Sequence, residues 1–177
     1  MSTDDEARPA ARLTVLTAPS GAGLGGVVEL VRARSPSVWV PVPATTRPRR
    51  PGERHGVDRL FCAPAEFDRM IAAEELLEWS RIGAYRRGTP RAPLRARLAQ
   101  GRPVLLPLDL PGALAVRVGW PDVPLVLLVP SRHRPDPAVV AAVGHTVAHD
   151  LTERAADELV GLLGSSYLAP AQPRLRG

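Results

Sequence analysis

Four closely spaced glycines are the first residues whose types and spacing could do chemistry: Gly21, Gly23, Gly25 and Gly26, in the stretch APSGAGLGG. They follow an apolar run and precede a segment with helical spacing. In such a turn, backbone N–H groups can cradle a phosphate at a helix N-terminus. A complete loop of this kind also has a lysine that reaches the phosphates and a hydroxyl that binds Mg²⁺. The sequence contains no lysine at all, so we expect the backbone of a phosphate loop without its charged side chain.

The stretch Ala18 to Gly26 resembles the motif GPSGxGKG[ST] of the guanylate kinase family. Leu24 stands in the place of the lysine and Gly26 in the place of the hydroxyl residue. We interpret Leu24 as a loss of function and predict very weak ATP binding. The degenerate loop comprises Ser20, Gly21, Gly23, Leu24, Gly25 and Gly26.

A second stretch, ATTRPRRPGERHGVD at 44–58, resembles the family signature SxTTRxxRxGExxGxxY. The resemblance implies that Arg47 and Arg50 hold the phosphate of GMP, with Glu53 in the same motif. Planar guanidinium groups suit bidentate phosphate recognition. Pro43 replaces a serine of the signature, and Arg59 replaces a phosphate-binding tyrosine. The alternative is that the arginines at 47, 49 and 50 form a solvated run of charge.

Two further segments resemble the parts of the family that bind guanine. In EELLEW at 74–79, Glu78 is expected to accept hydrogen bonds from guanine N1 and N2. The alternative is a surface glutamate on an edge strand. In IGAYRRGTPRAP at 82–93, Thr89 stands in the place of a guanine-contacting hydroxyl and keeps that group, and Arg87 stands where the family has a second phosphate-binding tyrosine.

The resemblance thus implies four arginines around one pocket: Arg47, Arg50, Arg59 and Arg87. Like charges at close range repel unless an anion lies among them. We hypothesise that the pocket prefers an anion with more charge than GMP, or a phosphorylated peptide.

The segment PVLLPLDL at 103–110 resembles the family's (L/I)DIDxQGA. Asp109 keeps one carboxylate, at the carboxyl end of a predicted strand, where α/β sheets bind ligands. Pro107 and Pro111 replace the other aspartate and the glutamine. Because proline removes a ladder hydrogen bond, Pro107 predicts a bulge or an edge strand.

The helical lid of the family, whose arginines close over ATP, has no full counterpart in this chain. SRHRPDP at 131–137 leads almost directly into the next segment, and Arg132 and Arg134 are either remnants of the lid or turn residues. Residues 147–168 resemble the terminal strand and helix, and Asp150 and Glu153 have capping-box spacing that places the helix start there.

Two histidines, His145 and His149, lie before this helix. A metal site needs a third ligand close by, so we expect surface loop positions and no metal site.

The elements that must position these residues alternate between short apolar runs and helical patterns, which is typical of an α/β fold with a parallel sheet. The resemblance specifies a P-loop NTPase, nucleoside monophosphate kinase fold with a small GMP-binding lobe. Strands are expected at 12–17, 38–42, 103–110 and 125–129, and helices at 25–34, from 64, at 91–100 and at 112–118. One domain is expected at 12–168, with the lobe at about 36–90 and disordered tails at 1–11 and 169–177.

Composition narrows the class of protein. The 177 residues are 45% apolar, which suits one globular domain. The single cysteine, Cys62, cannot form an internal disulfide. The acidic N-terminal stretch is no secretory signal and no apolar run has membrane length, so we expect a cytoplasmic protein. The net charge is +5, but arginines are dispersed and aromatics are few, so nucleic acid is not the expected partner.

Phosphoryl transfer depends on positioning and charge stabilisation. Losing one preorganised donor typically costs on the order of 10²-fold in rate. We therefore expect a catalytically impaired guanylate-kinase-like protein that binds a guanine nucleotide or a phosphorylated partner, with no cofactor. The alternatives are an active guanylate kinase, using Mg²⁺ and ATP with groups from a partner chain, and a regulator that associates with an active guanylate kinase. A homodimer is also open.

Overall fold

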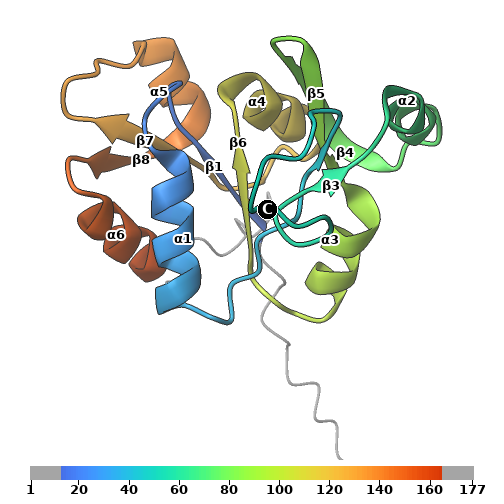
Figure 1. Cartoon of the computed structure of the whole chain (residues 1–177). Coiled ribbons are helices and arrows are strands. Elements are labelled where there is room, and N and C mark those ends of the chain that lie inside the picture. Colours follow the sequence, from blue (N-terminus) through green and yellow to red (C-terminus); the bar gives the residue numbers. More distant parts are fainter. Residues whose placement is uncertain (1–12, 165–177) are drawn as a thin grey trace, which may run out of the picture.

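The computed structural model describes residues 13–164 and contains a four-stranded parallel sheet at its centre (Figure 1). The strand order is β6-β1-β7-β8, and all three pairings are parallel. The strands are β1 (Leu13–Thr17), β6 (Val104–Leu108), β7 (Leu125–Pro130) and β8 (Gly144–His149). Every residue of β1 is buried, Thr14 and Thr17 included, since helices cover both faces of such a sheet.

Helices cover the two faces of the sheet. One face packs against α1 (Leu24–Arg34) and α6 (Thr152–Gly164), where Val27, Val31 and Leu159 meet Leu16 and Val126. The other face packs against three helices: α3 (Arg91–Ala99), α4 (Leu110–Gly119) and α5 (Pro137–Val143). This arrangement confirms the predicted α/β fold.

A second sheet forms a smaller unit beside the first. Its strand order is β3-β2-β5-β4, and α2 (Pro64–Ala72) buries Phe67 against it. The strands are β2 (Ala44–Thr45), β3 (Leu60–Phe61), β4 (Leu76–Ile82) and β5 (Tyr85–Pro90). This unit, hereafter the lobe, falls within the predicted lobe, whose outer limits stay a prediction.

The segment 38–42 is not a strand, which corrects the sequence prediction. Trp39 alone bridges to Val104, with its N–H donating to the Pro103 carbonyl at 2.9 Å. Pro41 and Pro43 follow and offer no N–H, so the ladder cannot extend. The prediction for Pro107 is confirmed, because β6 ends the strand order of its sheet.

The C-terminal half differs from expectation in two details. Helix α6 begins at Thr152 instead of Asp150, because the Leu151 carbonyl accepts the first helical hydrogen bond, from Ala155 at 3.1 Å. His145 and His149 lie on β8 and are partly buried, so the prediction of loop positions was wrong.

The reduced lid is confirmed. Residues 131–136 alone connect β7 to α5, where Asp136 caps the helix by accepting from the Ala138 N–H at 2.8 Å. Arg132 and Arg134 are exposed on this connection. The predicted tails at 1–11 and 169–177 lie outside the described residues. Within 13–164, no helix combines the length and the apolar character needed to cross a membrane.

Candidate functional site

The turn between β1 and α1 keeps the backbone of a phosphate loop. Gly21 and Gly23 have φ angles of 79° and 74°, a left-handed conformation that costs glycine little. Gly23 occupies the N-cap position of α1, and no side chain bonds to that helix start. The Gly26 N–H donates to the Gly23 carbonyl at 3.1 Å, so the N–H groups of Leu24 and Gly25 are the ones left for a ligand or for solvent.

The side chains of this loop do not fit Mg²⁺ or the terminal phosphates of ATP. Leu24 packs against the aliphatic cluster between the sheet and α1 and also lines the neighbouring cavity. Neither Gly25 nor Gly26 carries a hydroxyl, and the chain has no lysine to reach in from elsewhere. The donor set that such a loop needs is therefore missing, and no reaction step can be assigned through bound metal here.

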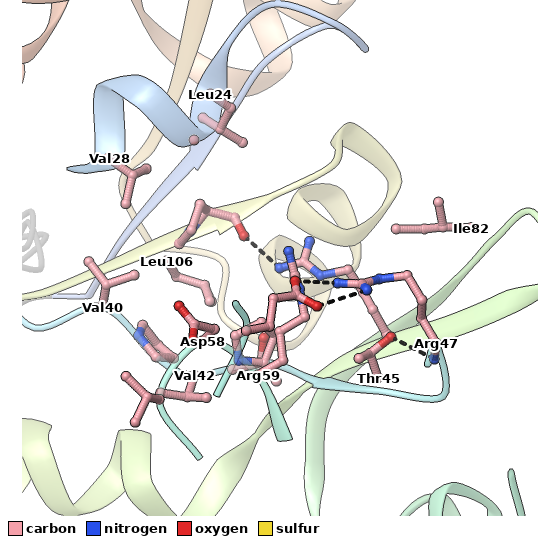
Figure 2. Close-up of a pocket in the computed structure, with 18 of the residues that line it drawn as sticks. Leu24, Val28, Val40, Val42, Thr45, Arg47, Asp58, Arg59, Ile82 and Leu106 are labelled. Atoms are coloured by element: carbon pink, nitrogen blue, oxygen red, sulfur yellow. Dashed lines mark hydrogen bonds and ion pairs between the residues drawn. The ribbon is translucent and has the colours of Figure 1, made fainter. Parts of the chain in front are cut away.

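A cavity of about 890 Å³ lies between α1 and the lobe (Figure 2). Figure 2 shows Leu24 and Val28 on the α1 side, and Arg47 and Arg59 on the opposite side. Its volume is in the range of small-molecule sites. Eight predicted site residues line it: Leu24, Gly25, Arg47, Arg50, Glu53, Arg59, Arg87 and Thr89. The others, Ser20, Gly21, Gly23, Gly26, Glu78 and Asp109, are not part of that lining.

Arg47 is anchored by Glu53 in a bidentate pair. The Nη1 and Nη2 groups donate to the two carboxylate oxygens at 3.0 and 2.7 Å. Glu53 also accepts from the backbone N–H of Arg50 at 2.8 Å. The bond to Arg47 is the main reason that the pKa of Glu53 falls to about 2. With its side chain only 17% exposed, Arg47 is not part of a solvated run, although Arg49 and Arg50 are exposed.

Arg59, which directly precedes β3, and Arg87 on β5 line the same cavity from the two sides of β2. Arg87 on β5 pairs with Thr45 on β2, and Ala44 of β2 pairs with Leu60, the residue after Arg59. Arg87 donates from Nη2 to the Pro107 carbonyl at 3.1 Å, while its buried Nε has no hydrogen-bond partner. Burial, and then the charges of Arg87 and Arg47, lower the pKa of Arg59. The structure therefore brings the four predicted arginines together.

Glu78 and Thr89 form a buried pair between β4 and β5. Their exposed fractions are 6% and 1%, so the alternative of a surface glutamate is wrong. The Thr89 hydroxyl donates to Glu78 Oε1 at 2.6 Å, whereas Oε2 is buried without a partner. Burial raises the pKa of Glu78. The pair offers an unused acceptor directly beside Thr89, which lines the cavity.

Asp109 caps α4 close to this acceptor, and its charge is a further cause that raises the pKa of Glu78. Its Oδ1 accepts from the Gly112 N–H at 2.9 Å, and Ser80 donates to its Oδ2 at 3.2 Å. A Cβ at Gly112 would lie 2.7 Å from Asp109 Oδ1 and 3.2 Å from Glu78 Oε2. Sequence reasoning missed Ser80 and Gly112. Of these two, only Gly112 could have been found from the sequence, because its place three residues after Asp109 is typical of a helix N-cap.

Comparisons with known proteins show the family of this chain. A family model described as "Guanylate kinase" matches residues 10–156. The chain belongs to the guanylate kinase family. The guanylate kinase of Thermobifida fusca (strain YX) is 55% identical over 119 residues, covering 67% of this chain and 61% of the relative. That of Streptomyces coelicolor is 50% identical over 125 residues, covering 71% and 62%. The chain thus spans about three-fifths of the length of these relatives.

A guanylate kinase from Anaplasma phagocytophilum has a similar structure, with a TM-score of 0.71 over 93% of this chain and 89% of the other. At 22% identity, this match shows the fold alone. Membership of the guanylate kinase family confirms the resemblance by which the site residues were chosen. Their roles in binding stay predictions.

Proposed function

We propose that this member of the guanylate kinase family binds a guanine nucleotide in the cavity of its lobe and transfers phosphoryl groups poorly. One observation carries the proposal. The lobe offers a buried acceptor pair and an arginine cluster, whereas the loop before α1 offers backbone alone.

Guanine recognition is assigned to Glu78 and Thr89. Guanine presents N–H donors at N1 and N2, and Glu78 Oε2 is a buried acceptor without a partner. Leaving such an atom unsatisfied costs free energy, which a donor from the ligand would recover. Adenine lacks this pair of donors. The nucleotide phosphate then falls to Arg47 and Arg50, which line the same cavity.

Impaired transfer follows from the residues around the phosphate loop. Leu24 supplies no charge, Gly25 and Gly26 supply no hydroxyl, and the connection at 131–136 supplies no lid. Each missing donor typically costs about 10²-fold in rate. Together they would leave little turnover.

A second candidate is an active guanylate kinase, and the relatives favour it. Those with 50% and 55% identity are named guanylate kinase. In this case the missing groups would come from a partner chain. A phosphorylated protein as the ligand, a homodimer, association with an active guanylate kinase and a cytoplasmic location remain further proposals.

Calorimetric titration with GMP and then with ATP, beside a coupled assay of ADP release, tests both candidates. The proposal expects GMP binding without turnover, with adenosine monophosphate binding far more weakly. Robust ADP release from ATP and GMP would establish the active enzyme. Absence of any GMP binding would overturn both candidates.

A further inference from the structure

The two sheets described between residues 13 and 164 have four edge strands, and three of these are protected against pairing with another strand. In the lobe, β3 has only two residues, and β4 has a register shift between Leu76 and Trp79. In the central sheet, β6 contains Pro107, and its Leu105 N–H donates to the Trp39 carbonyl at 2.9 Å. Short strands, irregular register, prolines and covering segments are common ways in which proteins block a sheet edge.

The fourth edge strand, β8, is regular and open. It is six residues long and pairs with β7 in an unbroken register from Gly144 to His149. Its sequence, GHTVAH, contains no proline, arginine, aspartate or glutamate. No strand or bridge within residues 13–164 pairs with its outer side, and Figure 1 shows β8 at the rim of the molecule, between α5 and α6. Alternate residues of β8 therefore keep N–H and C=O groups that a further strand could bond.

The surface beside this edge is made of small, uncharged side chains. Val147 packs in the cluster between the sheet and α1 and α6. Because side chains alternate between the two faces of a strand, the residues on either side of Val147 face α5, and they are exposed. Four residues of the seven-residue α5 are exposed as well. Together they form what we call the α5–β8 face: Ala138, Val140, Ala141, Ala142, Gly144, Thr146 and Ala148.

The charge of the chain makes this face unusual. The stretch PAVVAAVGHTVAH at 137–149 has no arginine, aspartate or glutamate, although 23% of the whole chain is charged. The net charge is +5, so two copies of the chain repel each other. Self-association is therefore favoured at a surface where like charges do not meet, and the α5–β8 face is such a surface. Its alanines and its glycine leave room for two backbones to approach closely.

We infer that the α5–β8 face binds a second copy of this chain, with the two β8 strands antiparallel across a two-fold axis. Such an axis makes the contact self-complementary, because each copy donates and accepts the same backbone hydrogen bonds. A second copy brings a strand of equal length with the same uncharged face, which a strand of unrelated sequence would match only by chance. The inference goes beyond the proposed function and does not depend on it, since the α5–β8 face shares no residue with the lining of the cavity.

Sedimentation velocity on the full chain tests the inference between about 1 and about 100 µM, where the dissociation constants of weak complexes lie. The fraction of dimer should rise with concentration. It should persist at high salt, because the contact is made by backbone hydrogen bonds and apolar side chains, which salt does not screen. A chain that stays monomeric over this range would overturn the inference.

Two charged variants assign the contact to its residues. Thr146→Lys and Ala142→Arg each bring like charges together across the two-fold axis, which should raise the dissociation constant of the dimer about 100-fold. Thr146→Val is the neutral control at the strand, and Ala96→Arg is the matched control at an exposed alanine of α3; both should keep the dimer. Thermal unfolding checks that each variant is folded, and Ala142→Arg, on an exposed helix surface, tests the inference even if Thr146→Lys fails to fold.

The outcomes separate the inference from the proposed function. A dimer that both charged variants leave intact, or one that high salt dissociates, would overturn the α5–β8 contact. Calorimetry with GMP should give the same affinity for Thr146→Lys as for the unmodified protein. A monomer that binds GMP would overturn the inference alone, whereas a dimer that Thr146→Lys dissociates and that binds no GMP would overturn the proposed function alone.

Discussion

The phosphate loop and the lobe face one cavity, but the loop contributes backbone groups to it and the lobe contributes polar side chains. The loop keeps its backbone, with Gly21 and Gly23 in left-handed conformations, but Leu24 brings no charge. The lobe keeps side chains with defined partners, such as the buried pair of Glu78 and Thr89. The glycines of the loop can form this turn for structural reasons alone, so they are weak evidence for a ligand. A buried carboxylate oxygen without a partner among the described residues is costly, so it is specific evidence for a polar contact at this position in a way that glycines are not.

The strongest test of this contrast is Glu78→Gln. The amide keeps the shape and can still accept from Thr89, but it replaces the unpaired oxygen with a donor. GMP affinity should fall about 10- to 100-fold, the value of a hydrogen bond to a charged group. Thermal stability should hold or rise, since the substitution removes a carboxyl group whose charge is costly to bury.

Calorimetry and a melting curve measure the two effects. Glu158→Gln, on the exposed side of α6, is the control and should change neither. A loss of stability with unchanged GMP affinity would assign Glu78 to structure and remove the distinction between lobe and loop.

A steric test of the same acceptor is Gly112→Ala. The added Cβ would lie 2.7 Å from Asp109 Oδ1 and 3.2 Å from Glu78 Oε2, so the cap and the acceptor must shift. We expect a loss of about 1–3 kcal/mol in the free energy of unfolding, as for other overpacked sites, and weaker GMP binding.

Gly119→Ala is a matched control for it on the same helix, because nothing lies within 4 Å of its Cβ. It should leave GMP binding unchanged. Equal effects of the two substitutions in chemical denaturation would show that Asp109 and Glu78 tolerate the shift.

The loop can be tested from the other direction, by restoring its charge. Leu24→Lys should raise ATP affinity about tenfold, the value of one charge-assisted contact, because the glycine turn is already formed. GMP affinity should not increase to the same extent. Leu24→Met, of similar length but neutral, is the control for calorimetry. Micromolar ATP binding by the unmodified protein would contradict the assignment of Leu24 as a lost contact.

The sequence predicted β1, β6 and β7 of the central sheet, and the motif resemblance named eight residues that line the cavity. The buried strand β7 is a short continuous apolar run, and β1 has Leu13, Val15 and Leu16 beside two threonines, a local pattern that is typical of strands covered on both faces. The arginines and Glu78 were predicted from the motif resemblance. Such a resemblance names the positions in the sequence but says nothing of how their side chains lie. The prediction of a strand at 38–42 was wrong because it gave more weight to the apolar residues than to Pro41 and the following Pro43. Neither proline has an N–H to donate to a strand ladder.

Contacts between distant segments could not be predicted in this way. The approach of Gly112 to Glu78 joins α4 to β4, and the bond between Arg87 and the Pro107 carbonyl joins the lobe to β6. No local pattern encodes such pairings, because they depend on how the two sheets pack. The missing partner of Glu78 Oε2 likewise became visible only in three dimensions.

The smallest expected effect concerns the anchor of the arginine cluster. The pKa of Glu53 is about 2 in the folded protein, below the ordinary 4.5, so the folded state binds fewer protons than the unfolded state. Its contribution to stability is therefore present above pH 4.5 and declines as pH falls towards 2.

Denaturant unfolding from pH 5 to 3 should show a shallower decline in the free energy of unfolding in Glu53→Gln than in the unmodified protein. Arg47→Met should flatten the curve in part, because the Arg50 N–H still bonds Glu53. Parallel curves for the unmodified protein and Glu53→Gln would mean that the anchor contributes no stability, and the arginines of the lobe would then be as loosely fixed as the loop.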